Sequence, residues 1–147
     1  MSSDNILSLG GVRIHAGWAT RDQALQEATD LLVAAGAVTP AYFEAMRDRE
    51  RTVSTFMGTE LAIPHGTNDT LETVLGSALT FVRYDGGVDW DGERVTFVVG
   101  IAGTGGEHLE TLSQIAILFS DPEEVEKLRT AATCEQLFSL VVPEGAT

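Results

Sequence analysis

The hydrophobic and polar positions in the first third of the chain predict two helices. Thr20 and Gln23 have the spacing of a capping box, and apolar residues then recur at helical spacing until Gly36. Thr39 followed by Pro40 has the features of a second helix start, a capping hydroxyl and a first-turn proline. We therefore expect two amphipathic helices, each with one face in the core.

Runs of apolar and β-branched residues in the middle of the chain predict strands. A short extended run covers 60–64, and residues 77–84 have the composition of a strand. The acidic, glycine-rich segment 85–93 is typical of a turn. The largely apolar segment 94–103 predicts a central strand that is buried on both faces of its sheet.

Helical patterns return after the glycine-rich segment 103–106. One helix is expected to begin near Glu107, with an inner face of Leu109, Leu112, Ile115, Ala116 and Phe119. Asp121–Pro122 and the pair Thr133 and Gln136 predict two more helix starts. Helices interleaved with apolar strands indicate an α/β fold, with helices on both faces of one sheet.

Composition and charge narrow the possible partners and the compartment. The 147 residues carry a formal net charge of −13. Because nucleic acids and anionic membranes bind basic surfaces, this charge argues against both as partners. No apolar run approaches the roughly 18 residues that span a bilayer. The one cysteine, Cys134, excludes an internal disulfide, favours a reducing compartment and fits a small buried apolar side chain. We expect a cytoplasmic protein that does not insert into a membrane.

His65 stands where a predicted strand ends, between Pro64 and Gly66. The proline restricts the backbone, and the glycine permits a sharp turn or the close approach of a ligand. Because α/β folds bind ligands where strands end and helices begin, His65 is a candidate for chemistry. The same three residues also fit a histidine in an ordinary turn.

His108 and Arg49 are two further candidates, and both favour an anion. His108 follows the glycines of GTGGE at a predicted helix start, where free backbone N–H groups and the helix dipole attract negative charge. Arg49 lies near the end of the second predicted helix, where a guanidinium can hold a phosphoryl group or simply complement the dipole. The third histidine, His15, has no comparable setting, and we expect it to be structural.

Several segments together resemble the IIA domains of the mannitol/fructose class of the phosphotransferase system. They are AYFEAMRDRERTVSTFMGTELAIPHGTND (41–69) and YDGGVDWDGERVTFVVGIAGTGGEHLETLSQIAILFSDPEEVEKL (84–128), in the order that the family has them. Within them HGTN, GGVDW and GIAGTGGEHLETLSQIA are most similar to the mannitol branch. The resemblance covers about 5–141 and implies a single IIA domain over 1–147, built on a mixed β-sheet with helices on both faces.

The resemblance assigns roles by position. His65 corresponds to the histidine that is phosphorylated at its tele nitrogen, His108 to a second histidine that stabilises the phosphoryl group, and Arg49 to an arginine that contacts this group. Relatives often read GNGIAIPHG where this chain has Thr59 and Glu60 in place of Asn and Gly. This departure adds a carboxylate near the site and removes none of the proposed chemical groups.

The resemblance also implies partners. Phospho-HPr, a small basic carrier protein, is the expected donor, and a IIB cysteine is the expected acceptor, coupled to a IIC permease for mannitol or a related sugar. IIB and IIC are expected on other chains, because Cys134 follows no phosphate-binding loop. We expect Glu60 and Glu107 to steer the basic donor by their charge.

Two alternatives belong to other classes of protein. A regulatory IIA-like module would use the phosphorylation state of His65 to control a partner protein. A hydrolase would use His65 and His108 as acid and base, but the chain has neither a GxSxG setting nor paired carboxylates. No cofactor or metal is expected, because no histidine has a cluster of acidic or cysteine residues at ligand spacing.

Overall fold

The computed structural model describes residues 6–66, 73–103 and 109–142. Helices and strands come in groups along the chain and do not alternate one by one as predicted. The strands are β1 (Val12–His15), β2 (Ala19–Thr20), β3 (Phe56–Gly58), β4 (Leu61–Ala62), β5 (Ala78–Leu79), β6 (Phe81–Trp90), β7 (Glu93–Val98) and β8 (Ile101–Ala102). The helices are α1 (Arg21–Ala34), α2 (Tyr42–Thr52), α3 (Leu109–Phe119), α4 (Pro122–Thr130) and α5 (Cys134–Val141), and a 3₁₀ turn, η2, covers Leu9–Gly11.

The main sheet is mixed, as expected. Its strand order is β1-β6-β7-β4-β3, with β2 also paired to β6. β1 and β2 run parallel to β6, and β4 runs parallel to β7, whereas the β6–β7 and β3–β4 pairs are antiparallel. A separate antiparallel pair, β5 and β8, accompanies this sheet, so the expectation of one sheet is incomplete.

The separate pair of β5 and β8 arises because both of the predicted strands, 77–84 and 94–103, are interrupted. Thr80 separates β5 from β6, and Gly100 lies between β7 and β8. The Gly100 amide donates to Thr80 Oγ1 over 3.1 Å, and the Thr80 amide donates to the Gly100 carbonyl over 2.9 Å. A Cβ at Gly100 would lie 2.6 Å from Thr80 Oγ1 and 2.9 Å from Ala28 Cβ. The close approach of the main chain to these two residues therefore requires glycine at position 100.

The turn expected over 85–93 is wrong for most of its length, because β6 continues to Trp90. Val88 and Trp90 are buried, and the pairing with β7 shifts register on the N-terminal side of Val88. Gly87 has a φ of 87°, which fits an irregular strand, and the chain reverses only near Gly92. The acidic residues and glycines therefore belong to an irregular strand. By contrast, the predicted central strand is confirmed for its first part, since β7 lies between β6 and β4 and is buried from Val95 to Val98.

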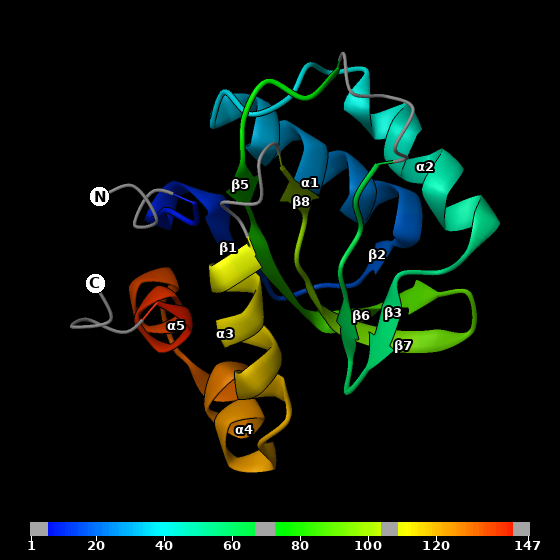
Figure 1. Ribbon diagram of the computed structural model, residues 1–147. Helices are drawn as coiled ribbons and strands as arrows, with labels where there is room; N and C mark the ends of the chain where they lie inside the picture. The colour runs from blue at the N-terminus through cyan, green and yellow to red at the C-terminus, as the bar shows by residue number, and fades with distance from the viewer. Residues whose placement is uncertain (1–5, 67–72, 104–108, 143–147) are drawn as a thin grey trace.

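Helices cover both faces of the sheet, as Figure 1 shows. One core cluster joins the sheet to α1 and α2, and a second joins it to α3, α4 and α5. Successive strand residues alternate between the two clusters: Ala62 and Val98 belong to the first, and their neighbours Leu61 and Phe97 belong to the second. The sheet is therefore buried on both sides, which is the expected fold class.

Most predicted helix starts are confirmed. Thr20 and Gln23 form the expected capping box, and the Thr133 side chain accepts from the Gln136 amide. The Asp121 side chain accepts from the Glu123 amide, with Pro122 in the first turn.

The predicted start of α2 is wrong, because Ala41 is its N-cap residue and no side chain caps it. The Tyr42 amide bonds to the Thr39 carbonyl, and the Thr39 amide bonds to the Thr73 carbonyl. Residues 39–41 therefore form a turn that leads into the helix.

The predicted inner face of α3 is partly wrong. Ile115 and Phe119 are buried, but Leu109 is 55% exposed and Ala116 is also exposed. Thr111 is buried instead, so the buried stripe is rotated away from the expected one. In α5, Cys134 is only partly buried against the second core cluster, less than expected.

Candidate functional site

His65 lies just beyond the end of β4, beside the start of β8. It forms an isolated parallel bridge with Ile101, and the Ile101 amide donates to the Pro64 carbonyl over 3.0 Å. The expectation that this histidine follows a strand end is confirmed. Because the neighbouring strand holds its main chain, His65 is presented by a fixed element.

The His65 ring has a defined tautomer when it is neutral. Its Nδ1 lies 2.9 Å from the Ile63 carbonyl oxygen, and a carbonyl can only accept a hydrogen bond. Nδ1 therefore carries the hydrogen, which leaves the lone pair on Nε2. The side chain is half-buried, so the orientation of the ring is restrained while part of it meets solvent. This arrangement suits Nε2 as a nucleophile.

Tyr42, in the first turn of α2, contacts the main chain directly after His65. Its hydroxyl accepts from the Gly66 amide over 2.8 Å and donates to the Ile101 carbonyl over 2.7 Å. Burial raises the pKa of the Tyr42 phenol, so the hydroxyl keeps its hydrogen and can donate. No local pattern in the sequence marks this polar role of Tyr42.

Arg49 differs from its two neighbouring arginines in its partners. Arg47 pairs with Asp22 and Glu44, and Arg51 pairs with Asp48. Arg49 donates to the Val53 carbonyl over 2.5 Å and forms no ion pair within the described residues. Its charge is therefore available to an anion that approaches.

Arg49 lies on the same face of α2 as Tyr42, further toward the end of the helix. Arg49 follows Tyr42 by seven residues, which is about two turns and roughly 10 Å along the same face. Tyr42 contacts Gly66 on that face. One face of α2 thus carries both a contact to the His65 segment and an arginine without an acidic partner.

Glu50 fixes the last turn of α2. It is 5% exposed, and its carboxylate accepts from the Thr55 amide over 3.2 Å, from the Thr55 hydroxyl and from Trp90 Nε1 over 3.1 Å. These bonds hold the turn next to Arg49 against β6. Sequence reasoning missed Glu50, because a carboxylate near a helix end resembles a solvated residue until the strand that it contacts is known.

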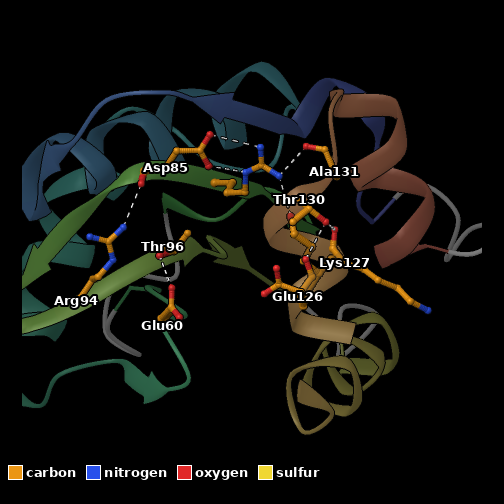
Figure 2. Close-up of polar contacts among 10 residues, drawn as sticks. Glu60, Asp85, Arg94, Thr96, Glu126, Lys127, Thr130 and Ala131 are labelled. Atoms are coloured by element: carbon orange, nitrogen blue, oxygen red, sulfur yellow. Dashed lines mark hydrogen bonds and ion pairs between the residues drawn. The ribbon is translucent and has the colours of Figure 1, made fainter. Parts of the chain in front are cut away.

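Thr59 and Glu60 form the two-residue hairpin loop between β3 and β4, and both have a positive φ, at 53° and 63°. Hairpin turns of this kind favour Asn-Gly, so the departure from the family pattern falls where it costs backbone strain. The Glu60 carboxylate accepts from Thr96 Oγ1 over 2.6 Å and from Arg129 Nη2 over 2.5 Å, and Figure 2 shows the Thr96 bond. These contacts anchor the strained loop.

Glu60 is therefore not the free steering charge that we expected. Arg129 holds its carboxylate in an ion pair, and the bond from Arg129 lowers the pKa of Glu60. His65 follows Glu60 by five residues, and five residues of extended chain span about 16 Å. The loop therefore lies well away from His65. Glu107, the other expected steering charge, lies outside the described residues.

A Glu60→Gln variant is expected to unfold more easily at pH 7, by about 0.5–1 kcal/mol, because the ion pair is partly exposed. The folded state lowers the pKa of Glu60 below 4.5, so its contribution is complete above that value and is lost as the pH falls through the folded pKa. Urea unfolding from pH 7 to pH 3 measures the difference. A gap between wild type and variant that stays constant over this range would contradict the ion pair.

His15 and the hollows near it lie away from His65. His15 Nε2 pairs with Glu27 over 2.7 Å, and its ring stacks on Tyr84, which agrees with the expected structural role. A hollow of about 520 Å³ is lined by Trp18, Arg21, Arg94 and the end of β6. Because β6 and β7 are antiparallel, that end of β6 lies at the end of the sheet opposite to His65.

His108 lies outside the described residues, so the structure joins only part of the predicted site. It brings together the His65 segment, the start of β8 and Tyr42 in the first turn of α2, whereas Arg49 lies about two turns further along this helix. Among the described residues, no group of three His, Cys, Asp or Glu side chains is arranged to hold a metal ion. The described part is a half-buried histidine with its lone pair on Nε2 and an arginine on the adjoining helix.

Comparison with known proteins agrees with this fold. The model of the family "Phosphoenolpyruvate-dependent sugar phosphotransferase system, EIIA 2" matches residues 5–142. The mannitol-specific phosphotransferase enzyme IIA component of Staphylococcus aureus is 48% identical over 136 residues, which cover 92% of this chain and 90% of that protein. Its counterpart in Halalkalibacterium halodurans is 41% identical over 139 residues, or 95% and 96% of the two chains.

A solved structure extends the likeness to three dimensions. The complex of enzyme IIAMTL and phosphorylated enzyme IIBMTL from Escherichia coli matches with a TM-score of 0.81 and 28% identity, over 92% of this chain and 97% of that chain. The chain belongs to the EIIA 2 family of the phosphoenolpyruvate-dependent sugar phosphotransferase system. The resemblance drawn from the sequence motifs is thereby confirmed.

Proposed function

We propose that this chain is a phosphocarrier for mannitol uptake, which accepts a phosphoryl group from phospho-HPr on Nε2 of His65 and passes it to the cysteine of a IIB component. The observation that carries the proposal is the bond from His65 Nδ1 to the Ile63 carbonyl, which leaves the Nε2 lone pair free. The mannitol-specific names of the relatives support the sugar, and the solved IIAMTL–IIBMTL complex supports a IIB partner.

Each transfer exchanges one bond to phosphorus for another. In the first step, the Nε2 lone pair attacks phosphorus while the N–P bond to the donor histidine breaks. In the second step, a cysteine thiolate of IIB attacks, an S–P bond forms and the Nε2–P bond breaks. The hydrogen stays on Nδ1 and donates to the Ile63 carbonyl throughout, so the ring keeps its orientation in both steps.

Charge on the phosphoryl oxygens needs stabilisation during transfer, and Arg49 and His108 are the groups that we assign to it. Arg49 has no acidic partner within the described residues, which supports this role. An arginine can give two parallel hydrogen bonds to two phosphoryl oxygens. The assignment of His108 depends on the sequence motif GEHLETL. No metal or cofactor takes part in this scheme.

We propose that the chain works in the cytoplasm as a single IIA domain, with phospho-HPr as donor, IIB as acceptor and a membrane IIC permease as the final component. None of the described helices is long and apolar enough to cross a membrane. We propose that it meets the permease only through IIB.

Reconstitution of the relay tests the function. The chain, enzyme I, HPr, a mannitol-class IIB domain and labelled phosphoenolpyruvate are mixed, and each protein is separated and counted. Label is expected first on this chain and then on IIB, and omission of this chain should leave IIB unlabelled. A chain that accepts label but passes none to IIB would contradict the carrier role and favour the regulatory module.

A further inference from the structure

The hydrogen bonds around His65 depart from those of a regular parallel ladder. In such a ladder, the amide of one residue donates to the carbonyl of the residue that precedes its partner. The carbonyl of the same residue accepts from the amide of the residue that follows its partner. Ile101, the partner of His65, makes the first bond, since its amide donates to the Pro64 carbonyl over 3.0 Å. The second bond would run from the Gly66 amide to the Ile101 carbonyl.

The Tyr42 hydroxyl occupies the place of that second bond. It accepts from the Gly66 amide over 2.8 Å and donates to the Ile101 carbonyl over 2.7 Å. Both main-chain groups keep a partner, but a hydroxyl oxygen now stands between the strands. The strands are therefore joined directly before His65 and through a side chain directly after it.

The Tyr42 ring is packed so that the hydroxyl stays in this place. Tyr42 is 3% exposed, and a Cβ added at Gly66 would lie only 2.6 Å from its Cε1 atom. Glycine at position 66 is therefore what allows the ring to lie against the main chain. Since Tyr42 belongs to α2, the helix that carries Arg49 is joined to the His65 segment by the same contact.

We propose that Tyr42 is a positioning residue for phosphoryl transfer: its inserted hydroxyl sets how far the His65 strand separates from β8, and so sets the position of the His65 imidazole. This inference rests on the proposed function. Without the hydroxyl, the Gly66 amide either bonds directly to Ile101 or loses its partner. In both cases the backbone next to His65 moves. Because the rate of transfer depends steeply on the positions of the reacting groups, this movement slows the reaction.

Tyr42→Phe tests the inference, because it removes the hydroxyl and keeps the ring that packs on Gly66. Tyr84→Phe is a matched control: Tyr84 is also 3% exposed, and its hydroxyl also makes a short bond, 2.6 Å to Glu27. Rapid-quench transfer from phospho-HPr is expected to show a first-order step that is slower by about tenfold or more in Tyr42→Phe, with KM for phospho-HPr unchanged. Tyr84→Phe should match wild type.

The amide of Gly66 supplies a readout that is independent of transfer. In ¹⁵N-labelled protein, Tyr42→Phe should shift the Gly66 resonance and change its hydrogen exchange, and Tyr84→Phe should leave both unchanged. Gly66→Ala is a second variant, whose Cβ displaces the ring while Tyr42 remains; it should slow the same step if Tyr42→Phe proves too unstable to assay.

The outcomes separate the two proposals. A wild-type chain that takes up no phosphate would overturn the proposed function itself. An active wild type with equal first-order rates in Tyr42→Phe and Tyr84→Phe would overturn the positioning role alone. A defect confined to KM would also overturn it, because a side chain as buried as Tyr42 does not meet the donor.

Discussion

A His65→Ala variant is expected to take up no phosphate from phosphoenolpyruvate in the presence of enzyme I and HPr, whereas the wild-type chain takes up one acid-labile phosphoryl group. The reason is the loss of the nucleophile. The hydrogen bond from Nδ1 to the Ile63 carbonyl keeps the lone pair of the His65 ring on Nε2, just beyond the end of β4. Labelled phosphoenolpyruvate and the intact mass of the protein measure the effect, and brief acid treatment identifies the N–P bond by its loss.

The matched control is His15→Ala, which removes a histidine from the structural contact with Glu27 and Tyr84. It should label as wild type does, even if it is somewhat less stable. Label that persists in His65→Ala would show that another residue is the acceptor and would defeat the assignment of His65.

The second large effect is expected at Arg49 and His108. Alanine at either position should slow transfer by more than tenfold, or roughly 1.4 kcal/mol of barrier, while the fold stays intact. Arg49→Lys should also be impaired, because an ammonium group cannot give the two parallel hydrogen bonds of a guanidinium. Single-turnover transfer from phospho-HPr, with circular dichroism as a check on folding, measures these changes.

Arg51→Ala controls for the loss of positive charge near the end of α2, since Arg51 already pairs with Asp48. It should retain most of the wild-type rate. If the Arg49 and His108 alanine variants also transferred at the wild-type rate, neither residue would stabilise the phosphoryl group. Arg49 would then have only a structural role, through its hydrogen bond to the Val53 carbonyl.

The features that sequence reasoning predicted correctly depend on neighbours along the chain. The capping box of Thr20 and Gln23 and the Thr133 cap join residues three positions apart. The position of His65 at a strand end follows from its flanking proline and glycine. Such local preferences are present before the chain folds, so they could be predicted without a structure.

The features that only the tertiary structure decided join residues far apart in sequence. The Tyr42 hydroxyl meets Ile101 across 59 positions, and Glu60 meets Arg129 across 69. The continuation of β6 through an acidic, glycine-rich segment also depends on its pairing with β2 and β7. The sequence alone singled out His65 and Arg49 as candidates, since each lies in a local motif, but it did not indicate the hydroxyl inserted beside His65. Its role exists only once two strand ends and a helix meet, because a buried amide and carbonyl then need a partner that their own ladder does not supply.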